Sequence, residues 1–252
     1  MAVLNMFARE ARGPALLFVH GFPLDNRIWM DVVSRMPPTV ALYAPDLPGC
    51  GKSSLPPLTW TMDEYARFLL RIMDERDFKK FFVAGHSMGG YIVFALLRLA
   101  PERIAGAALV SSRALPDPED VRKTRETVAQ RAEKEGPGFL AETMPARAVG
   151  ANPSPALLET LKTIMSAAQP AGVAAAARAM AARPDATPNL GRISCPTLVF
   201  AGRQDKIIPP AESEAMAKAI PGSKLIWCER SGHVPMLEEP ELVTRELAAL
   251  VK

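Results

Sequence analysis

The sequence Gly-His-Ser-Met-Gly at residues 85–89 constrains the fold more than any other part of the chain. It follows the apolar run Phe81–Ala84, which is typical of a buried strand, and leads into the helix-like stretch Met88–Leu99. Such an abrupt turn places Ser87 at strained backbone angles, and the flanking glycines let strand and helix pass closely. The helix dipole points at Ser87 and can stabilise negative charge there. The pattern predicts a nucleophilic serine at the end of a strand.

Short apolar runs alternate with helical stretches over most of the chain, which is typical of a parallel sheet covered by helices on both faces. The predicted strands lie at 4–8, 15–20, 40–44, 81–84, 104–110, 197–201 and 224–228. The predicted helices lie at 27–35, 62–76, 88–99, 210–219 and 240–251. We therefore expect an α/β fold with a mostly parallel sheet of about seven or eight strands flanked by helices.

Residues 114–187 break this alternation, because no convincing strand occurs there while Ala, Glu, Lys and Arg abound. Prolines at positions 137, 145, 153, 155, 170 and 184 divide the stretch into about four expected short helices. A pair of ordinary crossover helices would not use this many residues. We expect one core domain, formed by residues 1–113 and 188–252, with residues 114–187 inserted as a helical lid.

Length and composition exclude several classes of protein. The 252 residues suffice for one large domain, and a net charge of +3 without basic runs does not indicate nucleic-acid binding. No apolar stretch approaches the roughly 20 residues of a membrane span, and the first residues carry no secretory signal. Three cysteines without metal-like spacing suit a reducing cytoplasm. We expect a cytoplasmic protein without metal, cofactor, nucleic-acid or membrane partner, and the sequence leaves its oligomeric state open.

A serine hydroxyl needs a base to act as a nucleophile, and the chain has 3 histidines to supply one. His86 neighbours Ser87 along the backbone, so its side chain should point away from the serine hydroxyl. His20 ends a predicted strand and is interpreted as a buried histidine that bonds to loop backbone. His233 lies between the last predicted strand and the last predicted helix, where it can reach over the edge of the sheet. We therefore predict His233 as the base.

The predicted acid is Asp205, which would hold His233 in the required tautomer. Asp205 closely follows the predicted strand 197–201, whereas the strand 104–110 is followed by Ser-Ser-Arg and no acid. In this chain order the acid comes before the histidine and after a strand. A loop aspartate more often caps a helix or forms a turn, and that reading is the alternative.

A tetrahedral intermediate needs two hydrogen-bond donors aimed at its oxyanion. The turn at Ser87 itself supplies one of them, the backbone N–H of Met88. The other should come from the loop that follows the predicted strand 15–20, where Phe22 comes after His-Gly. We predict the backbone N–H groups of Phe22 and Met88 as the oxyanion hole.

One segment partly resembles a phosphate-binding loop. It is Asp-Leu-Pro-Gly-Cys-Gly-Lys-Ser at residues 46–53, and it shares the final Gly-Lys-Ser of such loops. The first glycine of that motif is missing, because position 46 is an aspartate. Cys50 has no second histidine left to activate it as a nucleophile. We interpret the segment as a structural loop and Cys50 as a small residue that fills space beside the site.

Together these motifs resemble the α/β-hydrolase fold superfamily over essentially the whole chain. They are His-Gly-Phe-Pro-Leu-Asp at 20–25, Asp-Leu-Pro-Gly at 46–49, Gly-His-Ser-Met-Gly-Gly at 85–90, Asp205 and Gly232-His233. The chain looks similar to small bacterial carboxylesterases, 3-oxoadipate enol-lactonases and cofactor-free haloperoxidases (perhydrolases). The resemblance implies a sheet of about eight strands, a lid after the sixth strand and a triad of Ser87, Asp205 and His233. Only one strand is predicted before Ala15, so the family's first strand should be missing here.

The residues expected around Ser87 are mostly apolar, which suits a pocket for a small molecule. The predicted pocket walls are Phe22, Leu24, Trp29, Met88 and Met236 from the core, and Phe139, Leu140, Met144 and Met165 from the lid. For the four lid residues, plain packing of short helices is the alternative.

The sequence predicts an enzyme, a serine hydrolase that cleaves a carboxylic ester with a short or medium acyl chain, or a lactone, through an acyl-enzyme on Ser87. Epoxide hydrolases and haloalkane dehalogenases that look like this chain carry an aspartate nucleophile, so Ser87 argues against both. Two alternatives stay open: a perhydrolase or acyltransferase that uses the same triad, and a non-catalytic ligand-binding protein on the same fold. The partner expected in each case is a small molecule.

Overall fold

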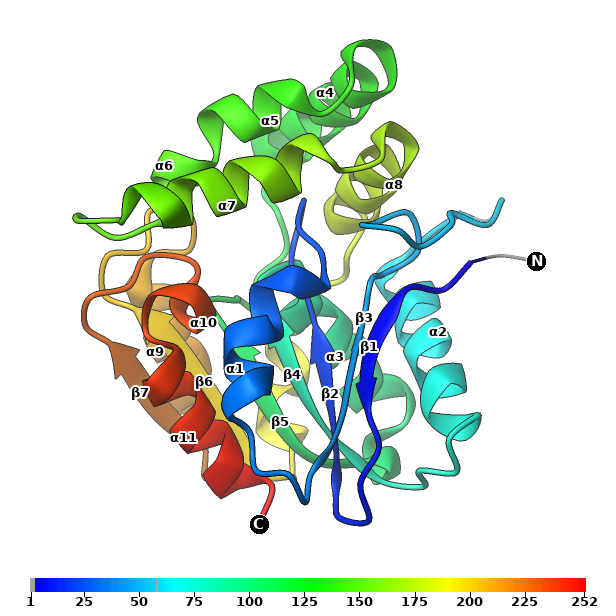
Figure 1. The fold of residues 1–252 in the computed structure, drawn as a ribbon, viewed down its shortest axis with the longest axis vertical. Helices are drawn as coiled ribbons and strands as arrows, with labels where there is room; N and C mark the ends of the chain where they lie inside the picture. Colours follow the sequence, from blue (N-terminus) through cyan, green and yellow to red (C-terminus); the bar gives the residue numbers. More distant parts are fainter. Residues whose placement is uncertain (1–2, 58) are drawn as a thin grey trace.

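The computed structural model describes residues 3–57 and 59–252, which form a mostly parallel sheet. The strand order in this sheet is β1-β3-β2-β4-β5-β6-β7 (Figure 1). The strands are β1 (Met6–Arg9), β2 (Ala15–Val19), β3 (Ala41–Pro45), β4 (Phe81–His86), β5 (Ile104–Val110), β6 (Thr197–Gly202) and β7 (Lys224–Cys228). β1 pairs antiparallel with β3, and the other neighbouring pairs are parallel. The predicted α/β fold is confirmed.

The central strands are continuously apolar because helices cover both of their faces. Every residue of β2 and β3 is buried, and in β4 only Phe82 is partly exposed. The strand predicted at residues 4–8 runs instead from Met6 to Arg9, at the antiparallel edge of the sheet. The other strand ends differ from the prediction by at most a few residues, as expected for apolar runs without sharp boundary signals.

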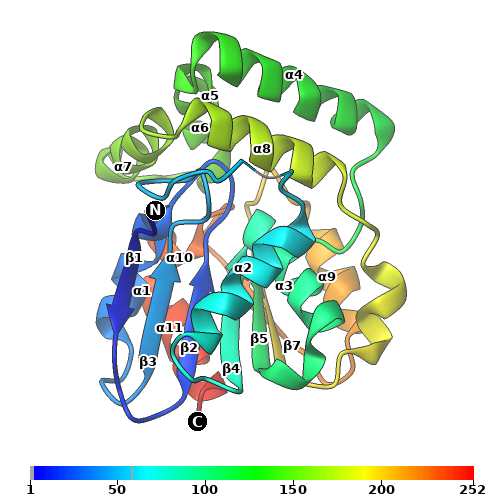
Figure 2. The same cartoon turned by 90° about the vertical axis from the view of Figure 1, so that its right-hand side faces the viewer.

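Two groups of helices cover the two faces of the sheet (Figures 1 and 2). On one face α1 (Met30–Arg35) packs against α11 (Pro240–Leu250), and on the other α2 (Met62–Asp74) packs against α3 (Met88–Leu99). The second group includes α9 (Pro210–Ala219). Their buried side chains form two apolar clusters, one on each side of the sheet. The sheet is thus the middle layer of three.

Several short helices were not predicted from the sequence. They are η1 (Asn26–Trp29), η2 (Pro101–Arg103), η3 (Thr187–Arg192) and α10 (Pro235–Glu238). The helix predicted at residues 27–35 is therefore two helices, η1 and then α1. The Asp25 carboxylate accepts the backbone N–H of Arg27 at 3.0 Å, which starts the tighter 3-10 turn.

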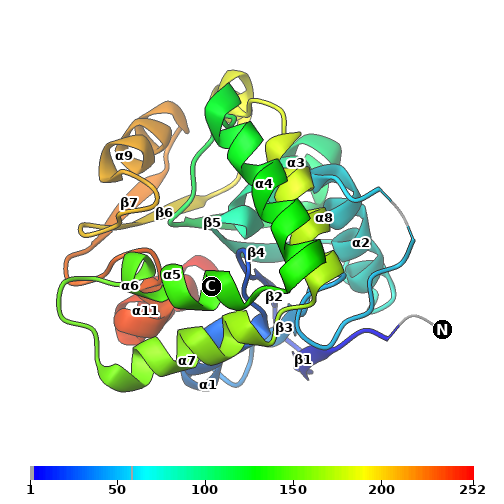
Figure 3. The same ribbon diagram turned by 90° about the horizontal axis from the view of Figure 1, so that it is seen from above.

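Five α-helices lie between β5 and η3 in the chain and sit together over the carboxyl edge of the sheet (Figures 1 and 3). These inserted helices are α4 (Glu119–Glu135), α5 (Gly138–Thr143), α6 (Pro145–Ala148), α7 (Pro155–Ser166) and α8 (Pro170–Ala181). The expectation of four short helices is wrong. No proline interrupts α4, which reaches 17 residues, and Pro145 starts a separate helix directly after α5.

The described residues contain seven strands, where the family resemblance implied about eight. The missing strand is the first one, as expected, since β1 is the one described strand before β2. The inserted helices consequently follow the fifth strand of this chain. Among the described residues, no helix has the length and apolar character needed to cross a membrane.

Candidate active site

Ser87 forms the turn between β4 and α3 with a φ of 50° and a ψ of −111°. This conformation is strained for a serine, as the sequence predicted. Its N–H donates to the Val110 carbonyl at 2.9 Å, and its carbonyl accepts the Ser112 hydroxyl at 2.9 Å. A Cβ on Gly85 would lie 2.4 Å from the Gly89 carbonyl oxygen, so only glycine fits where strand and helix pass. The turn is therefore held through the backbone N–H and carbonyl of Ser87, and the residue is partly exposed.

Asp205 and His233 follow β6 and β7 and are hydrogen-bonded to each other. His233 Nδ1–H donates to Asp205 Oδ2 at 2.8 Å, and both side chains are buried. The other carboxylate oxygen, Oδ1, accepts the backbone N–H groups of Ile207 at 2.8 Å and Ile208 at 2.9 Å. One carboxylate oxygen of Asp205 thus forms a turn, which is the alternative role expected from the sequence, and the other oxygen holds His233. This bond keeps the proton on Nδ1 and leaves Nε2 as an acceptor.

His86 connects the His233 loop to the turn at Ser87. Its Nε2–H donates to the backbone carbonyl of His233 at 2.8 Å, and the two rings meet edge to face with centroids 4.9 Å apart. Burial lowers the pKa of His86 well below its ordinary value, so the ring is neutral. His86 therefore serves as a structural link, consistent with the expectation that it is not the base.

A glutamate that sequence reasoning missed joins the His233 loop to the inserted helices. Glu238 Oε2 accepts the N–H of Gly232 at 2.8 Å, and its Oε1 accepts the N–H of Gly150 at 2.7 Å. The N–H of His233 itself donates to the carbonyl of Ala148 at 2.7 Å. Burial raises the pKa of Glu238, while the two N–H groups oppose that rise. No local pattern marks Glu238, because its partner Gly150 is 88 residues away in the sequence.

His20 and the loop at residues 46–53 are structural, as expected. His20 is fully buried; its Nδ1–H donates to the Gly21 carbonyl at 3.0 Å, and its Nε2 accepts the N–H of Leu47 at 2.9 Å. The Asp46 carboxylate accepts the N–H groups of Asn26 and Lys52, each at 2.9 Å, and so closes the loop. Asp46 thus occupies the loop interior with its carboxylate, which leaves this segment no resemblance to a phosphate cradle.

The two predicted oxyanion donors belong to segments that flank Ser87. Met88 is the first residue of α3, directly after the serine. Phe22 lies in the loop after β2, and the pairing of Val19 with Gly85 places that loop beside the turn at Ser87. Both N–H groups stay predictions for the oxyanion hole.

Among the described residues, no group of three or more His, Cys, Asp or Glu side chains is placed to hold a metal ion.

Comparison with known families decides what kind of protein this is. The model of the alpha/beta hydrolase family matches residues 16–246. The chain belongs to the α/β-hydrolase family. The resemblance drawn from the sequence motifs is thereby confirmed, and family membership supports hydrolase activity.

Individual α/β-hydrolases are similar to this chain at moderate identity. A thermophilic esterase from Thermogutta terrifontis, solved with malate bound, is 38% identical, with a TM-score of 0.95 over 100% of this chain and 95% of that one. The enol-lactonase from Burkholderia xenovorans LB400 is 24% identical, with a TM-score of 0.90 over 99% and 96% of the two chains, and shares the fold.

A curated relative is longer than this chain. The dihydrolipoyllysine-residue acetyltransferase component of the acetoin cleaving system from Pseudomonas putida is 27% identical over 248 residues. The match covers 95% of this chain and 64% of that protein. The chain therefore spans slightly less than two thirds of that relative.

The predicted pocket walls of this α/β-hydrolase are packed in apolar clusters. Four of them lie in the cluster on the α1 and α11 side of the sheet: Leu24, Trp29, Met165 and Met236. Met88 lies in the cluster on the other side. The remaining four gather between the inserted helices: Phe22, Phe139, Leu140 and Met144. Six of the nine are buried, Phe22, Phe139 and Met144 are partly buried, and contact with substrate stays a prediction for all nine.

Proposed function

We propose that the protein is a serine hydrolase that cleaves carboxylic esters with short or medium acyl chains, or lactones, through an acyl-enzyme on Ser87. The observation that carries the proposal is the 2.8 Å bond from His233 to Asp205. His86, the residue before Ser87, donates to the His233 carbonyl and so connects the His233 loop to the strained turn of Ser87. A buried acid that orients a histidine beside a strained serine matches the requirements of nucleophilic catalysis.

The proposed reaction has two displacements. His233 Nε2 takes the proton of the Ser87 hydroxyl while Oγ attacks the carbonyl carbon, and the N–H groups of Phe22 and Met88 bind the oxyanion. His233 then returns the proton to the leaving alkoxide, which leaves the acyl group on Ser87. In the second displacement His233 takes a proton from water and the hydroxide attacks the acyl carbon. His233 then returns that proton to Ser87 Oγ as the bond to the acyl carbon breaks and the acid departs.

In this proposal residues 114–187 act as a lid over a core made of residues 1–113 and 188–252. The inserted helices place apolar side chains near the Phe22 loop, since Phe22 packs with Phe139, Leu140 and Met144. An apolar wall suits an aliphatic acyl chain. Similarity at 38% identity to a protein described as an esterase supports ester hydrolysis over other reactions of the family.

Hydrolysis of p-nitrophenyl acetate, butyrate and octanoate by the purified chain tests the proposal. We expect turnover of the acetate or butyrate, and a loss of about 10⁴-fold or more in kcat for Ser87→Ala. Ser34→Ala is the control, because its hydroxyl is exposed on α1 and bonds to the carbonyl of Asp31 in the same helix. Turnover that survives in Ser87→Ala, or an inactive but folded wild type, contradicts the proposal. A rate increase with added peroxide would favour the perhydrolase alternative.

A further inference from the structure

A cavity of about 320 Å³ lies beside α3, where the inserted helices join the rest of the molecule. Both connections line it: Arg113 and Ala114 on the way into the inserted helices, and residues 183–186 on the way out. Ser87, Asp205, His233 and the nine predicted pocket walls do not line it. The cavity is therefore separate from the candidate active site.

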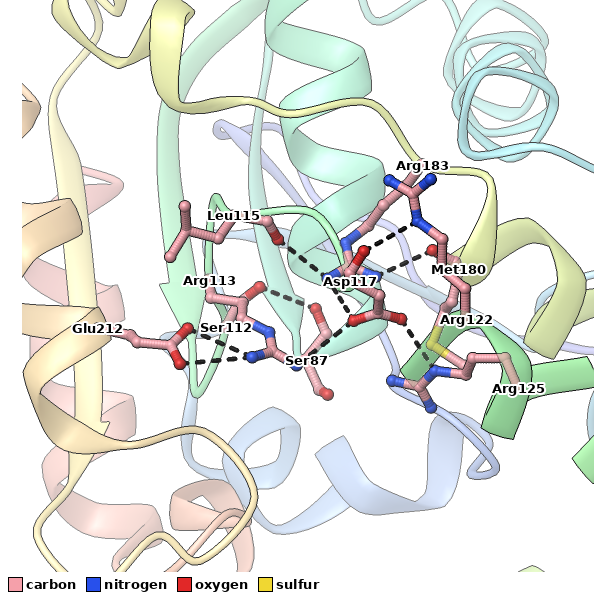
Figure 4. A network of polar contacts seen from close by, with 10 residues as sticks. All are labelled: Ser87, Ser112, Arg113, Leu115, Asp117, Arg122, Arg125, Met180, Arg183 and Glu212. Atoms are coloured by element: carbon pink, nitrogen blue, oxygen red, sulfur yellow. Dashed lines mark hydrogen bonds and ion pairs between the residues drawn. The ribbon is translucent and has the colours of Figure 1, made fainter. Parts of the chain in front are cut away.

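Two arginines of a polar cluster, Arg113 and Arg183, line this cavity. Figure 4 shows the cluster. Asp117 is fully buried and receives Arg183 at 2.8 Å, Arg125 at 3.1 Å and Arg113 at 3.4 Å. Arg113 reaches Glu212 as well, at 3.3 Å. Three guanidinium groups thus share two carboxylates, and the cluster keeps an excess of positive charge. An excess charge in a largely buried cluster is unfavourable unless a counter-ion approaches.

Two donors of the cluster lack a partner. The Nε atoms of Arg113 and Arg183 are buried without a hydrogen bond, and both residues line the cavity. The Arg183 side chain is only 3% exposed, and its guanidinium stacks 4.1 Å from the centre of the Tyr91 ring. A buried N–H without an acceptor destabilises the protein, so the cluster is not fully satisfied by the protein's own groups.

The rest of the lining is suited to an apolar group. Tyr91, Phe94, Leu97 and Ile193 contribute carbon surface. The two acids of the lining already have partners: Asp63 pairs with Arg98, and Asp185 accepts the N–H and hydroxyl of Thr187. Neither acid therefore cancels the excess charge at Arg113 and Arg183.

We propose that this cavity is a second binding site, which takes a small organic carboxylate whose anionic end meets Arg113 and Arg183 and whose apolar body lies along α3. The ligand bridges the two connections of the inserted helices, because both of them line the cavity. This second site is inferred from its own lining residues, so it does not depend on the ester hydrolysis proposed for Ser87.

Cys195 gives a local reporter, because it lines the cavity and is partly exposed while Cys50 and Cys228 are buried. Burial raises the pKa of the Cys195 thiol, so alkylation with iodoacetamide should be followed at about pH 9 and located by peptide mass. The probe is sodium hexanoate, and its uncharged match is 1-hexanol. Hexanoate near saturation should slow alkylation of Cys195 by about threefold or more, and hexanol should not.

Two variants test the role of the arginines. Arg113→Gln removes a charge that lines the cavity, whereas Arg125→Gln removes a charge that binds the same Asp117 without lining the cavity. We expect protection by hexanoate to disappear in Arg113→Gln and to persist in Arg125→Gln. If Arg113→Gln does not fold, Ala186→Phe, which adds a large side chain to the lining of the cavity, should abolish protection instead. Equal protection by hexanol, equal loss in both arginine variants, or no protection of the wild type overturns the proposal.

Discussion

The carboxyl edge of the sheet and the inserted helices above it are held by different kinds of contact. At the sheet edge, backbone groups fix the reactive side chains. Ser87 is bound through its own N–H and carbonyl, and Asp205 accepts two consecutive backbone N–H groups. Backbone atoms are fixed by the strands, so these side chains have little freedom to move.

The inserted helices instead rely on small apolar side chains and on ion pairs. α4 packs against α8 through Ala129, Ala174 and Ala177, and Arg178 of α8 binds Glu126 and Glu133 of α4. These ion pairs are largely exposed, and such pairs contribute little to stability. We infer that the sheet edge determines the chemistry, while α4 and α8 can shift or change with little effect on it.

Two of the junctions between these regions differ in character. At one, Glu238 and the carbonyl of Ala148 bind the His233 loop through backbone N–H groups. At the other, the side chains of Arg113, Arg125 and Arg183 converge on Asp117 (Figure 4). The first junction should therefore influence catalysis and the second should influence stability.

The largest effect is expected for Asp205→Asn. Asparagine can still accept the backbone N–H groups of Ile207 and Ile208 through its oxygen, but its NH₂ would face the Nδ1 position of His233 and favour the wrong tautomer. We expect kcat to fall by about 10⁴-fold while the protein stays folded. The matched control is Asp185→Asn, a loop aspartate that accepts a backbone N–H without contacting a histidine. A similar loss in both variants would remove the distinction between the two regions.

Asp117→Asn should have the next largest effect, on stability. Removing the carboxylate leaves the guanidinium groups of Arg183 and Arg125 without their counter-charge, which we expect to lower the free energy of unfolding by about 3–5 kcal/mol. Activity per folded molecule should change far less than in Asp205→Asn. Urea denaturation followed by circular dichroism measures the loss, and Glu126→Gln, which removes an exposed ion pair of α4, is the control.

The ion pairs of Asp117 predict that the stability of the protein depends on pH. Burial alone would raise the pKa of Asp117, but the hydrogen bonds and charges of Arg183 and Arg125 lower it below its ordinary value of 3.8. The contribution of Asp117 is therefore fully present above pH 3.8 and is lost as the pH falls through the lower, folded-state pKa. The stability difference between wild type and Asp117→Asn should shrink in acid; a difference that grows there would contradict the assignment.

Glu238→Gln tests the junction at the His233 loop. A carboxylate accepts the N–H groups of Gly232 and Gly150 together, whereas glutamine must turn its NH₂ toward one of them. An unmatched buried donor costs about 1–3 kcal/mol, and we expect kcat to fall by about tenfold with a smaller change in KM. Glu241→Gln, an exposed glutamate on α11, should leave both constants unchanged. An unaltered kcat in Glu238→Gln would show that this contact does not position His233.

The smallest effect is expected for Phe139→Ala in α5. If the inserted helices shape only the acyl pocket, the ratio of kcat/KM for p-nitrophenyl octanoate and butyrate should change by about threefold to tenfold. Acylation of Ser87 should remain. A loss comparable to that of Asp205→Asn would place Phe139 among the residues that fix the chemistry.

The contrast between the two regions explains what the sequence could predict. The seven strands, Ser87, Asp205 and His233 follow from local patterns, since strand ends and tight turns depend on neighbouring residues. Contacts such as Glu238 with Gly150, or Asp117 with Arg183, join residues 88 and 66 positions apart and leave no local signal. The helix pattern of residues 114–187 was predicted, but not the uninterrupted 17 residues of α4, because proline positions mark helix starts as well as helix ends.

Trapping of the nucleophile tests the central claim most directly. The chain is incubated with a fluorophosphonate, and the modified peptide is identified by mass spectrometry in the wild type, Ser87→Ala, Ser112→Ala and Asp205→Asn. We expect one adduct, on Ser87, that is absent from Ser87→Ala, retained in Ser112→Ala and formed far more slowly in Asp205→Asn. A folded protein without an adduct, or an adduct on another residue, would contradict the account.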